Sequence, residues 1–225
     1  MKNIPFDHTE IPLFHDISSD ELNAMLSCLH SYRKIFRKGE IIIMEQDAIQ
    51  YTGIILSGTV HMMKEDIWGR HTLLADLQEH ETIGELFAVQ KEQSSYVSFY
   101  AATDVEILFV ATRNIIHSCP SQCAFHEQLT LNMFDLIGKK SLRLMEKIEI
   151  TSKPILREKI MAYLSIQSQK QHSRYFTIPL GRSELADYIG ANRSALTREL
   201  SLMRDDGLID YDQKTFRIFE TETKK

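Results

Sequence analysis

The stretch "RSELADYIGANRSALTREL", Arg182–Leu200, places a single glycine between two runs of helical periodicity. Ala186 is small enough to allow a close helix crossing, and Gly190 suits the left-handed conformation that ends a helix. Asn192 can cap the run that follows. A small residue, a turn glycine four positions later and an apolar residue six positions beyond it, Leu196, form the spacing of a helix-turn-helix unit.

The second run has two chemically different faces. Arg193, Ser194, Thr197 and Arg198 share one face, and these side chains can bond guanine edges and phosphates in a major groove. The residues expected to pack inward are Leu185, Tyr188 and Ile189 of the first run and Ala195, Leu196 and Leu200 of the second. Glu199 stands where such units usually bury an apolar residue, and we expect it to turn outward. A helical hairpin with a solvated polar face is the alternative interpretation.

The segments around this unit complete a DNA-binding pattern. "GLIDYDQKTFRIF", 207–219, predicts two strands joined by a hairpin turn, which would form a wing. The charge distribution agrees with this assignment. The 225-residue chain has a net charge of −5, but 152–225 holds 13 Lys and Arg against 10 Asp and Glu, a balance of +3. The C-terminal third is therefore the part that could face phosphate.

The N-terminal half has a different period. "SSDELNAMLSCL", 18–29, predicts a short helix with Ser18 and Glu21 at capping-box spacing. From Tyr32 to about Val110, short β-rich runs alternate with turn glycines. Many short strands of this kind indicate a β barrel or jelly roll.

A long amphipathic helix is predicted from about Pro120 to Ile150. At 1.5 Å per residue it would span about 45 Å, more than the β domain needs to cover itself. We therefore expect it to form a dimer seam, and the alternative is a helix lying along its own domain. The residues expected to face the partner helix are Leu129, Met133, Ile137 and Leu144. The predicted domains are a sensor roll over 1–117, a dimerisation helix over 118–151 and a winged helix-turn-helix over 152–225.

The chain resembles the cyclic-AMP receptor and fumarate-nitrate regulator family of bacterial transcription factors, Crp/Fnr. The resemblance rests on "KGEIIIMEQD" (38–47), "IILSGTV" (54–60), "GELF" (84–87), the long helix and the Arg182–Leu200 unit, in that order. It implies an α+β fold with an N-terminal cyclic-nucleotide-binding-like jelly roll, a central dimerisation helix and a C-terminal winged helix-turn-helix. It also implies a homodimer on an inverted-repeat operator, an effector held in the roll, and RNA polymerase as a further candidate partner.

The resemblance implies site residues in both domains. Arg193, Ser194 and Arg198 fall where family members contact bases, and Arg198 matches an arginine that reads guanine. The predicted DNA-binding set is Arg182, Ser183, Asn192, Arg193, Ser194, Thr197 and Arg198. The predicted effector pocket is Gly84, Glu85, Leu86, Phe87, Ser95, Tyr96, Phe99, Phe125 and Leu129.

The roll departs from the family at the position that binds a cyclic phosphate. Ser95 falls where the family places an arginine, and Tyr96 follows it in place of a small hydroxyl residue. A buried phosphate without a cationic partner is costly. We therefore expect the signal not to be a cyclic nucleotide but an apolar small molecule or a redox change.

Other chemistry is considered for "HSCPSQCAFH", 117–126. Cys119 and Cys123 could sense oxidants or, with His117 and His126, hold a metal, although the spacing is not a common zinc pattern. The alternative is two helix-start cysteines with exposed histidines, and we assign no metal ligands. Three cysteines cannot supply four thiolates to an iron–sulfur cluster within one chain.

Other functional classes are weaker. No Gly-rich phosphate loop, Gly-x-Ser-x-Gly elbow or His-Glu-x-x-His motif argues for an enzyme. A small-molecule-binding module that does not touch DNA is opposed by the basic, winged C-terminal third. The sequence has neither a membrane-length apolar run nor a signal-peptide pattern, so we expect a cytoplasmic protein without a membrane partner.

Overall fold

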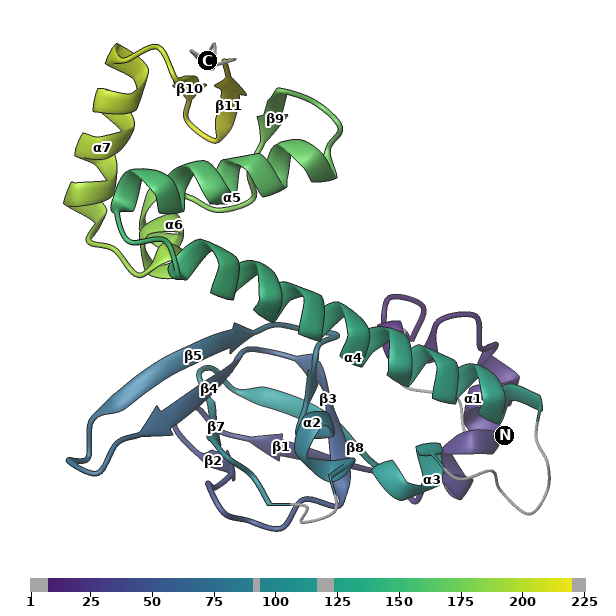
Figure 1. Ribbon diagram of the computed structural model, residues 1–225. Coiled ribbons are helices and arrows are strands. Elements are labelled where there is room, and N and C mark those ends of the chain that lie inside the picture. Colours follow the sequence, from purple (N-terminus) through teal and green to yellow (C-terminus); the bar gives the residue numbers. More distant parts are fainter. Residues whose placement is uncertain (1–7, 91–93, 117–123, 220–225) are drawn as a thin grey trace. The chain divides into compact units, whose positions relative to one another are not determined.

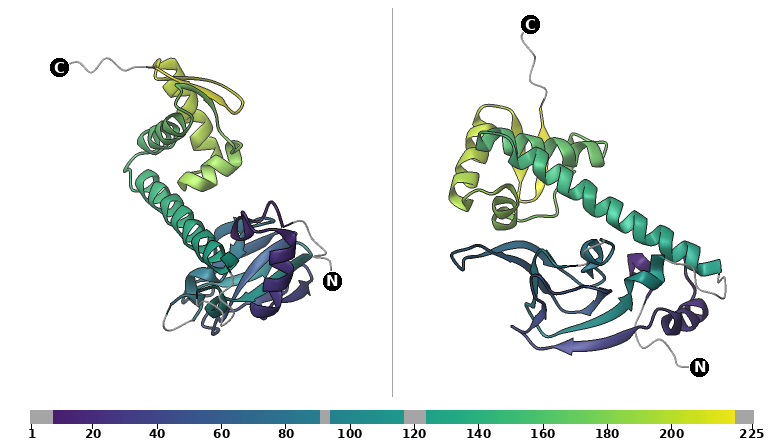
Figure 2. Two further views of the ribbon diagram at one scale, coloured as in Figure 1. Left: turned by 90° about the vertical axis from the view of Figure 1, so that its right-hand side faces the viewer. Right: turned by 60° about the horizontal axis from the view of Figure 1, so that its bottom comes forward.

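The computed structural model describes residues 8–90, 94–116 and 124–219 and separates into two compact units, Met1–Gly138 and Lys139–Lys225. Figures 1 and 2 show both units and the long helix α4 (Ala124–Thr151), which runs without interruption. The combination of a β-rich unit and a helix-rich unit with a small sheet is the α+β architecture that the sequence predicts. Each unit is described by itself below.

The first unit is a roll of two antiparallel four-stranded sheets. One sheet has the order β1-β8-β3-β6 and the other the order β2-β7-β4-β5. Their bounds are β1 Tyr32–Phe36, β2 Ile41–Ile43, β3 Tyr51–Ser57, β4 Val60–Glu65, β5 His71–Leu77, β6 Thr82–Ile83, β7 Ser98–Ala101 and β8 Val105–Ala111. The interior between the sheets is apolar and includes Ile55, Phe99 and Phe109. This arrangement confirms the predicted jelly roll.

Short helices cover the outer face of the first sheet. They are η1 (Pro12–Phe14), α1 (Ser19–Cys28) and α3 (Thr112–Ile116), and α2 (Glu85–Ala88) follows β6. The capping box of α1 is present, because Ser18 Oγ accepts the N–H of Glu21 and Glu21 Oε2 accepts the N–H of Ser18. A second apolar cluster forms where these helices and the start of α4 meet Leu108 and Val110 of β8. Successive residues of β8 therefore serve two different cores.

The hairpin between β4 and β5 extends beyond the neighbouring strands (Figure 1). Asp66 orders its tip, because Asp66 Oδ1 accepts the N–H groups of Trp68 and Arg70, each at 2.9 Å. Gly69 takes the positive φ of 77° that the turn requires. The tip is thus well defined by its own hydrogen bonds, yet it leaves Ile67 and Trp68 almost fully exposed.

Besides the C-terminal part of α4, the described residues of the second unit form three helices and a three-stranded sheet of order β10-β11-β9. The elements are α5 Leu156–Lys170, β9 Tyr175–Thr177, α6 Arg182–Ile189, α7 Arg193–Asp205, β10 Ile209–Asp212 and β11 Thr215–Ile218. Its core joins residues from every element, including Leu164, Leu196 and Phe216. The helix-turn-helix and the hairpin appear in the predicted order, so the predicted winged architecture is confirmed.

Candidate nucleic-acid interface and sensor pocket

The turn between α6 and α7 is built by the residues that the sequence singles out. Gly190 ends α6 with a φ of 66°, and the N–H of Ala191 returns to the carbonyl of Ala186 at 2.8 Å. Asn192 Oδ1 then accepts the N–H of Ser194 at 2.8 Å and caps α7. Only three residues therefore separate the two helices, which fixes the direction of α7.

Packing divides α7 into a buried and an exposed face. Leu196, Leu200 and Met203 are fully buried against α5 and α6. Leu185, Ala186 and Ile189 of α6 are buried on the other side of the same core. The prediction that Ala195 packs inward is wrong, because Ala195 is exposed. It lies between Ser194 and Thr197 in the sequence, on the polar side of the helix, where its methyl group is smaller than the side chains around it.

The exposed face of α7 carries two cations without carboxylate partners. Asn192, Arg193, Ser194, Thr197 and Arg198 are all exposed. Among the residues that the structure describes, neither Arg193 nor Arg198 forms an ion pair. Thr197 Oγ1 donates to the carbonyl of Arg193 at 2.9 Å, so its hydroxyl proton is used within the helix. The two guanidinium groups are therefore the free donors of this face.

Arg182 has a different environment from the other predicted contacts. Its guanidinium carbon lies 4.7 Å from the ring centre of Tyr211 and 5.2 Å from that of Phe216. Burial lowers the pKa of Arg182, and Tyr211 partly opposes that effect. The side chain thus joins α6 to the wing. Ser183, one residue later, is exposed.

Arg157 of α5 holds the outer end of α7, and sequence reasoning missed it. Its Nε donates to Glu199 Oε1 and its Nη1 donates to Asp206 Oδ2, each at 2.6 Å. Hydrogen bonds to Glu199 and then Asp206 raise the pKa of Arg157. Glu199 turns away from the apolar core, as expected, but toward a cation rather than into open water. The three residues fix α7 against α5 at a position that no local motif reveals.

In the roll, Gly84 begins the "GELF" segment with a φ of 79°, which a residue with a side chain rarely adopts. Glu85 and Ser95 are each only 2% exposed, whereas Tyr96 is 67% exposed. Ser95 Oγ donates to the carbonyl of Val97 at 2.5 Å and accepts the N–H of Val97 at 3.4 Å. Ser95, the residue expected at the family's arginine position, is therefore buried, and its hydroxyl is already hydrogen-bonded within its own turn.

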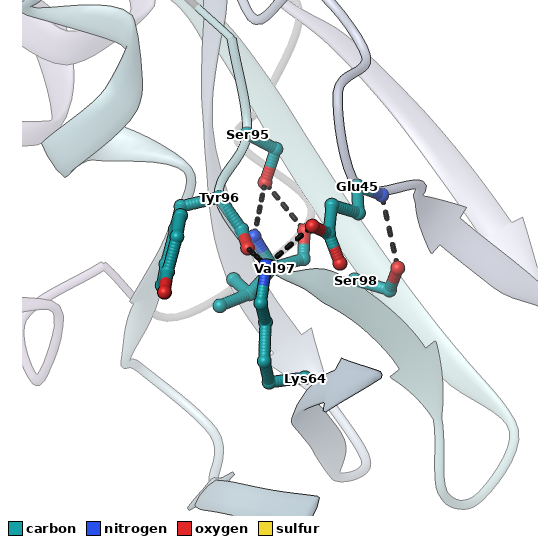
Figure 3. A network of polar contacts seen from close by, with 6 residues as sticks. All are labelled: Glu45, Lys64, Ser95, Tyr96, Val97 and Ser98. Carbon is teal, nitrogen blue, oxygen red and sulfur yellow. Dashed lines mark hydrogen bonds and ion pairs between the residues drawn. The ribbon is translucent and has the colours of Figure 1, made fainter. Parts of the chain in front are cut away.

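Among the described residues, a cation reaches this turn from another strand (Figure 3). Lys64 of β4 forms an ion pair with Glu45, and its Nζ donates to the carbonyl of Tyr96 at 3.0 Å. The same ammonium lies 3.9 Å from the ring centre of Tyr96. The N–H of Glu45 donates to Ser98 Oγ at 2.9 Å. Lys64 is thus neutralised and surrounded by its own chain, and only long-range contacts reveal this role.

The predicted effector residues fall into two separate groups. Phe87 and Phe99 belong to the cluster between the sheets, and Gly84 packs against Ile43 and Ile49 there. Phe125 and Leu129 belong to the cluster between α1, β8 and α4. Leu86 is half-buried. The structure therefore does not gather all nine predicted residues around one cavity, since a sheet lies between the two groups.

The long helix corrects the predicted seam. Leu129 and Met133 are fully buried against their own unit, and Ile137 packs beside them. Because these side chains already have an intramolecular partner, they cannot face a second helix, and that prediction is wrong. Leu144 is exposed, as expected. The large apolar residues exposed along α4 are Leu131, Phe134, Leu142, Leu144, Met145 and Ile148.

The exposed face of α4 follows a seven-residue repeat. Leu131, Gly138 and Met145 are seven residues apart, as are Phe134, Ser141 and Ile148, and the two series are offset by three. This is the a/d pattern of a helix that pairs with another helix. The small residues in the middle would allow close backbone approach.

The candidate redox and metal residues lie mostly outside the described part of the chain. This applies to His117, Cys119 and Cys123. His126 is buried, and its Nε2 lies 2.6 Å from the carbonyl of Asn114. Over residues 8–90, 94–116 and 124–219, no group of three or more His, Cys, Asp or Glu side chains is arranged for a metal ion. The same residues form no helix that is long and apolar enough to span a membrane.

Comparison with known families gives two matches in the order of the two units. The family model described as "Cyclic nucleotide-binding domain" matches residues 33–118. The model described as "Crp-like helix-turn-helix domain" matches residues 158–222. The matches include the "GELF" segment and both helices of the helix-turn-helix.

Individual relatives span most of the chain. The "Cyclic AMP receptor protein" of Thermus thermophilus is 24% identical over 212 residues, which cover 93% of this chain and 93% of that protein. The "cAMP-activated global transcriptional regulator CRP" of Escherichia coli is 24% identical over 184 residues, 74% of this chain and 80% of the relative.

Solved structures share the fold at low identity. The c-di-GMP-responsive global regulator CLP of Xanthomonas campestris has a TM-score of 0.55 at 18% identity, covering 88% of this chain and 98% of its own. CprK complexed with OCPA has a TM-score of 0.62 at 13% identity, covering 88% and 89%. Taken with the two family models, the roll, the helix-turn-helix and its arginine-bearing face lead to one conclusion: the chain belongs to the Crp/Fnr family of DNA-binding transcription regulators and is not an enzyme.

Proposed function

We propose that this regulator acts as a homodimer that reads an inverted-repeat operator and responds to a signal other than a cyclic nucleotide. The observation that carries the proposal is the exposed face of α7, where Arg193 and Arg198 are uncovered and form no ion pair with a carboxylate of the described residues. Family members bind DNA and are typically dimeric, which supports the assembly. We place its action in the cytoplasm, with RNA polymerase as a further partner.

The dimer seam that we propose is the heptad face of α4. Its a and d positions are Leu131, Phe134, Gly138, Ser141, Met145 and Ile148. Phe134 is 67% exposed and Met145 is 64% exposed. When a second helix covers apolar side chains of this size, their removal from water is energetically favourable. A second copy offers the same repeat and therefore satisfies the pattern by symmetry.

The operator geometry follows from two-fold symmetry. Two copies of α7 can enter successive major grooves on one side of the duplex when the half-site centres lie about 34 Å, or one helical turn, apart. We propose Arg193, Ser194 and Arg198 as base contacts, Asn192 and Thr197 as further contacts of the same face, and Ser183 as a contact from α6. Arg182 is a weaker candidate, because its guanidinium is stacked on the wing.

A gel-shift series tests this arrangement. Sites selected from random duplexes are rebuilt with the half-sites moved apart by two, five and ten base pairs. We expect affinity to drop when the spacing changes by two or five base pairs, because the second α7 then faces the wrong side of the duplex. Equal affinity for a single half-site and for the repeat, at a salt concentration held constant, would contradict the dimeric reader.

The relatives named above are a cyclic-AMP receptor, a cAMP-activated regulator and a c-di-GMP-responsive regulator. Two features oppose the same ligands here. Ser95 is buried and bonded to Val97. Lys64, the cation beside it, is already paired with Glu45. A phosphate in this place would have to displace Glu45 from Lys64 and would lose its hydration without an arginine to replace it. Together these losses cost about 2–5 kcal/mol.

Titration calorimetry with cyclic AMP and cyclic GMP separates the possibilities. We expect no binding tighter than roughly millimolar, because each ~1.4 kcal/mol lost is tenfold in affinity. A dissociation constant below about 10 μM for either nucleotide would contradict the proposal. We propose an apolar small molecule or a redox change as the signal. Operator affinity of reduced and oxidised protein, compared with Cys119→Ser and Cys123→Ser, tests the second option.

A further inference from the structure

A small cavity opens at the end of the roll where the edge strands of the two sheets meet. β1 is an edge strand of one sheet and β2 an edge strand of the other. The cavity has a volume of about 170 Å³. It is lined by Tyr32, Lys34, Phe36, Ile42, Ile43, Asp47, Ala48, Ile49, Gln50, Tyr51 and Phe109. None of these residues belongs to the predicted effector set.

Strand alternation explains why this end is open. Tyr32, Lys34 and Phe36 share one face of β1, whereas Arg33 and Ile35 point to the other face. Phe36 is buried, but Tyr32 is 45% exposed. The row of β1 that contains Tyr32 and Phe36 therefore carries aromatic side chains from the interior to the opening of the cavity.

The walls of the cavity are aromatic and hold one another. Tyr32 stacks on Phe109 with ring centres 5.1 Å apart, and it meets Tyr51 edge-on at 5.2 Å. Phe36 and Phe109 lie 6.4 Å apart, edge to face. Ile43 and Ile49 close the inner end, where both are buried. A dry cavity of ~150 Å³ holds benzene in another protein, so this one has room for a single six-membered ring.

Two charged groups line the cavity, and they are not equivalent. Lys34 Nζ lies 4.6 Å from the ring centre of Phe36, and within the described residues it has no ion pair. Asp47 Oδ2 already accepts the N–H of Met44 at 2.9 Å. Burial, followed by the neighbouring Tyr51, raises the pKa of Tyr32, so its hydroxyl remains a neutral donor. The mobile, uncompensated group is therefore the ammonium of Lys34.

We infer that this cavity is a binding site for a single-ring aromatic carboxylate, with the ring against the walls formed by Tyr32, Phe36 and Phe109 and the carboxylate on Lys34. The ring would replace water on apolar walls, and the anion would gain a charge-assisted hydrogen bond. The fit explains why a lysine occurs in a row whose other members are aromatic.

The cavity also has a route to the "GELF" segment. A Cβ atom placed on Gly84 would lie 3.3 Å from Cγ2 of Ile49 and 3.5 Å from Cδ1 of Ile43. These two isoleucines thus stand between the cavity and the first residue of that segment. A ligand that shifts either isoleucine would change the packing beside Gly84, because protein interiors are close-packed. The cavity would be a second input to the sensor domain, whatever the identity of the main signal.

Three single-ring ligands of similar size test the inference on the full-length protein: benzoate, benzamide and benzylamine. Calorimetry or ligand-detected NMR should give benzoate a dissociation constant of roughly 0.1–2 mM, as expected for nine heavy atoms. We expect benzamide to bind at least about fivefold more weakly and benzylamine to bind weakest, because only the carboxylate meets Lys34. Equal binding of all three, or tightest binding of benzylamine, would overturn the assignment.

Variants locate the binding. Lys34→Gln should weaken benzoate to the level of benzamide and leave benzamide unchanged. Lys38→Gln makes the same charge change at an exposed turn outside the cavity and should alter neither. Ala48→Leu, which adds volume from an exposed lining position, should weaken both. The inference fails if Lys38→Gln acts like Lys34→Gln, if Ala48→Leu has no effect, or if benzoate leaves the Gly84 amide resonance unmoved.

Discussion

Two helix faces in this protein are equally uncovered but chemically opposite. α4 exposes Phe134, Met145 and Ile148 in a heptad repeat, whereas α7 exposes Arg193 and Arg198. Apolar side chains gain free energy when another surface removes them from water, but a guanidinium gains only if its new partner is anionic. Exposure alone therefore does not identify a binding face. The chemistry of the exposed atoms is the better guide, and on that basis we propose a protein partner for the α4 face and nucleic acid for the α7 face.

The largest effect is expected from a charge on the α4 face. Phe134→Glu places a carboxylate at a d position, where two copies would bury two like charges. We expect light scattering to report 26.1 kDa instead of twice that mass. Affinity for the inverted repeat should fall about 100-fold or more, since the second half-site no longer binds intramolecularly.

Arg143→Glu is the matched control for that change. Arg143 lies at an f position of the same repeat, on the side away from the a and d positions. The variant should remain dimeric at micromolar concentration. If Phe134→Glu also stays dimeric, the apolar face of α4 is not the seam and the contrast between the two helix faces fails.

The second effect concerns the α7 face. Arg198→Ala should weaken operator binding by about 1–3 kcal/mol and relax the preference at one base pair in each half-site. Selection from a randomised operator measures both quantities. Arg204→Ala is the control, because Arg204 stacks on Tyr211 of the wing at 5.2 Å, near the C-terminal end of α7 and six residues beyond Arg198. Equal losses on specific and random DNA would show that Arg198 contacts phosphate only.

A smaller effect should follow loss of the support behind α7. Arg157→Met removes both carboxylate contacts from Glu199 and Asp206 while keeping much of the side-chain volume. These ion pairs are partly exposed, so we expect a two- to fivefold loss of specific affinity, about the range of such pairs. Arg157→Lys cannot bridge both carboxylates, so its specific affinity should lie between that of the wild type and that of Arg157→Met. An unchanged ratio of specific to random binding would remove Arg157 from the positioning of α7.

The smallest effect concerns Asp104, a charged residue that is paired within the chain, in contrast to Arg193 and Arg198 on α7. The N–H of Lys38 and the guanidinium of Arg37 donate to Asp104 and lower its pKa. A carboxyl with a lowered folded-state pKa stabilises the protein above its unfolded value, ~3.9, and that contribution disappears as pH falls through the folded value. Asp104→Asn should therefore lower Tm slightly at pH 7 and by less at pH 2.5. The same loss at both values would show a role other than charge.

Sequence reasoning succeeded where the determinants are local. Gly190 and Asn192 fix the turn and the cap within four residues of each other, so they predicted the helix-turn-helix directly. The α4 face could not be predicted in this way. Its apolar residues lie on two sides, and only the folded α1 and β8 show that Leu129 and Met133 are already covered.

Contacts between residues that are distant in the sequence could not be predicted either. Arg157 and Glu199 are 42 residues apart, and Lys64 and Tyr96 are 32 apart. Periodicity shows which face a residue occupies but not which other element packs there. The predicted effector residues failed to converge for the same reason, because adjacent residues of one strand can point into different cores.

The exposed tip of the β4–β5 hairpin has an optical consequence. Trp68 is the single tryptophan of the chain, and it is 76% exposed on a turn held by Asp66. Selective excitation of indole therefore reports one point in the first unit and should give a red-shifted emission that iodide quenches readily. A blue shift with loss of quenching would mean that this tip has been covered. Unlabelled protein thus carries a fluorescent reporter for contacts of the roll that does not sit on α7.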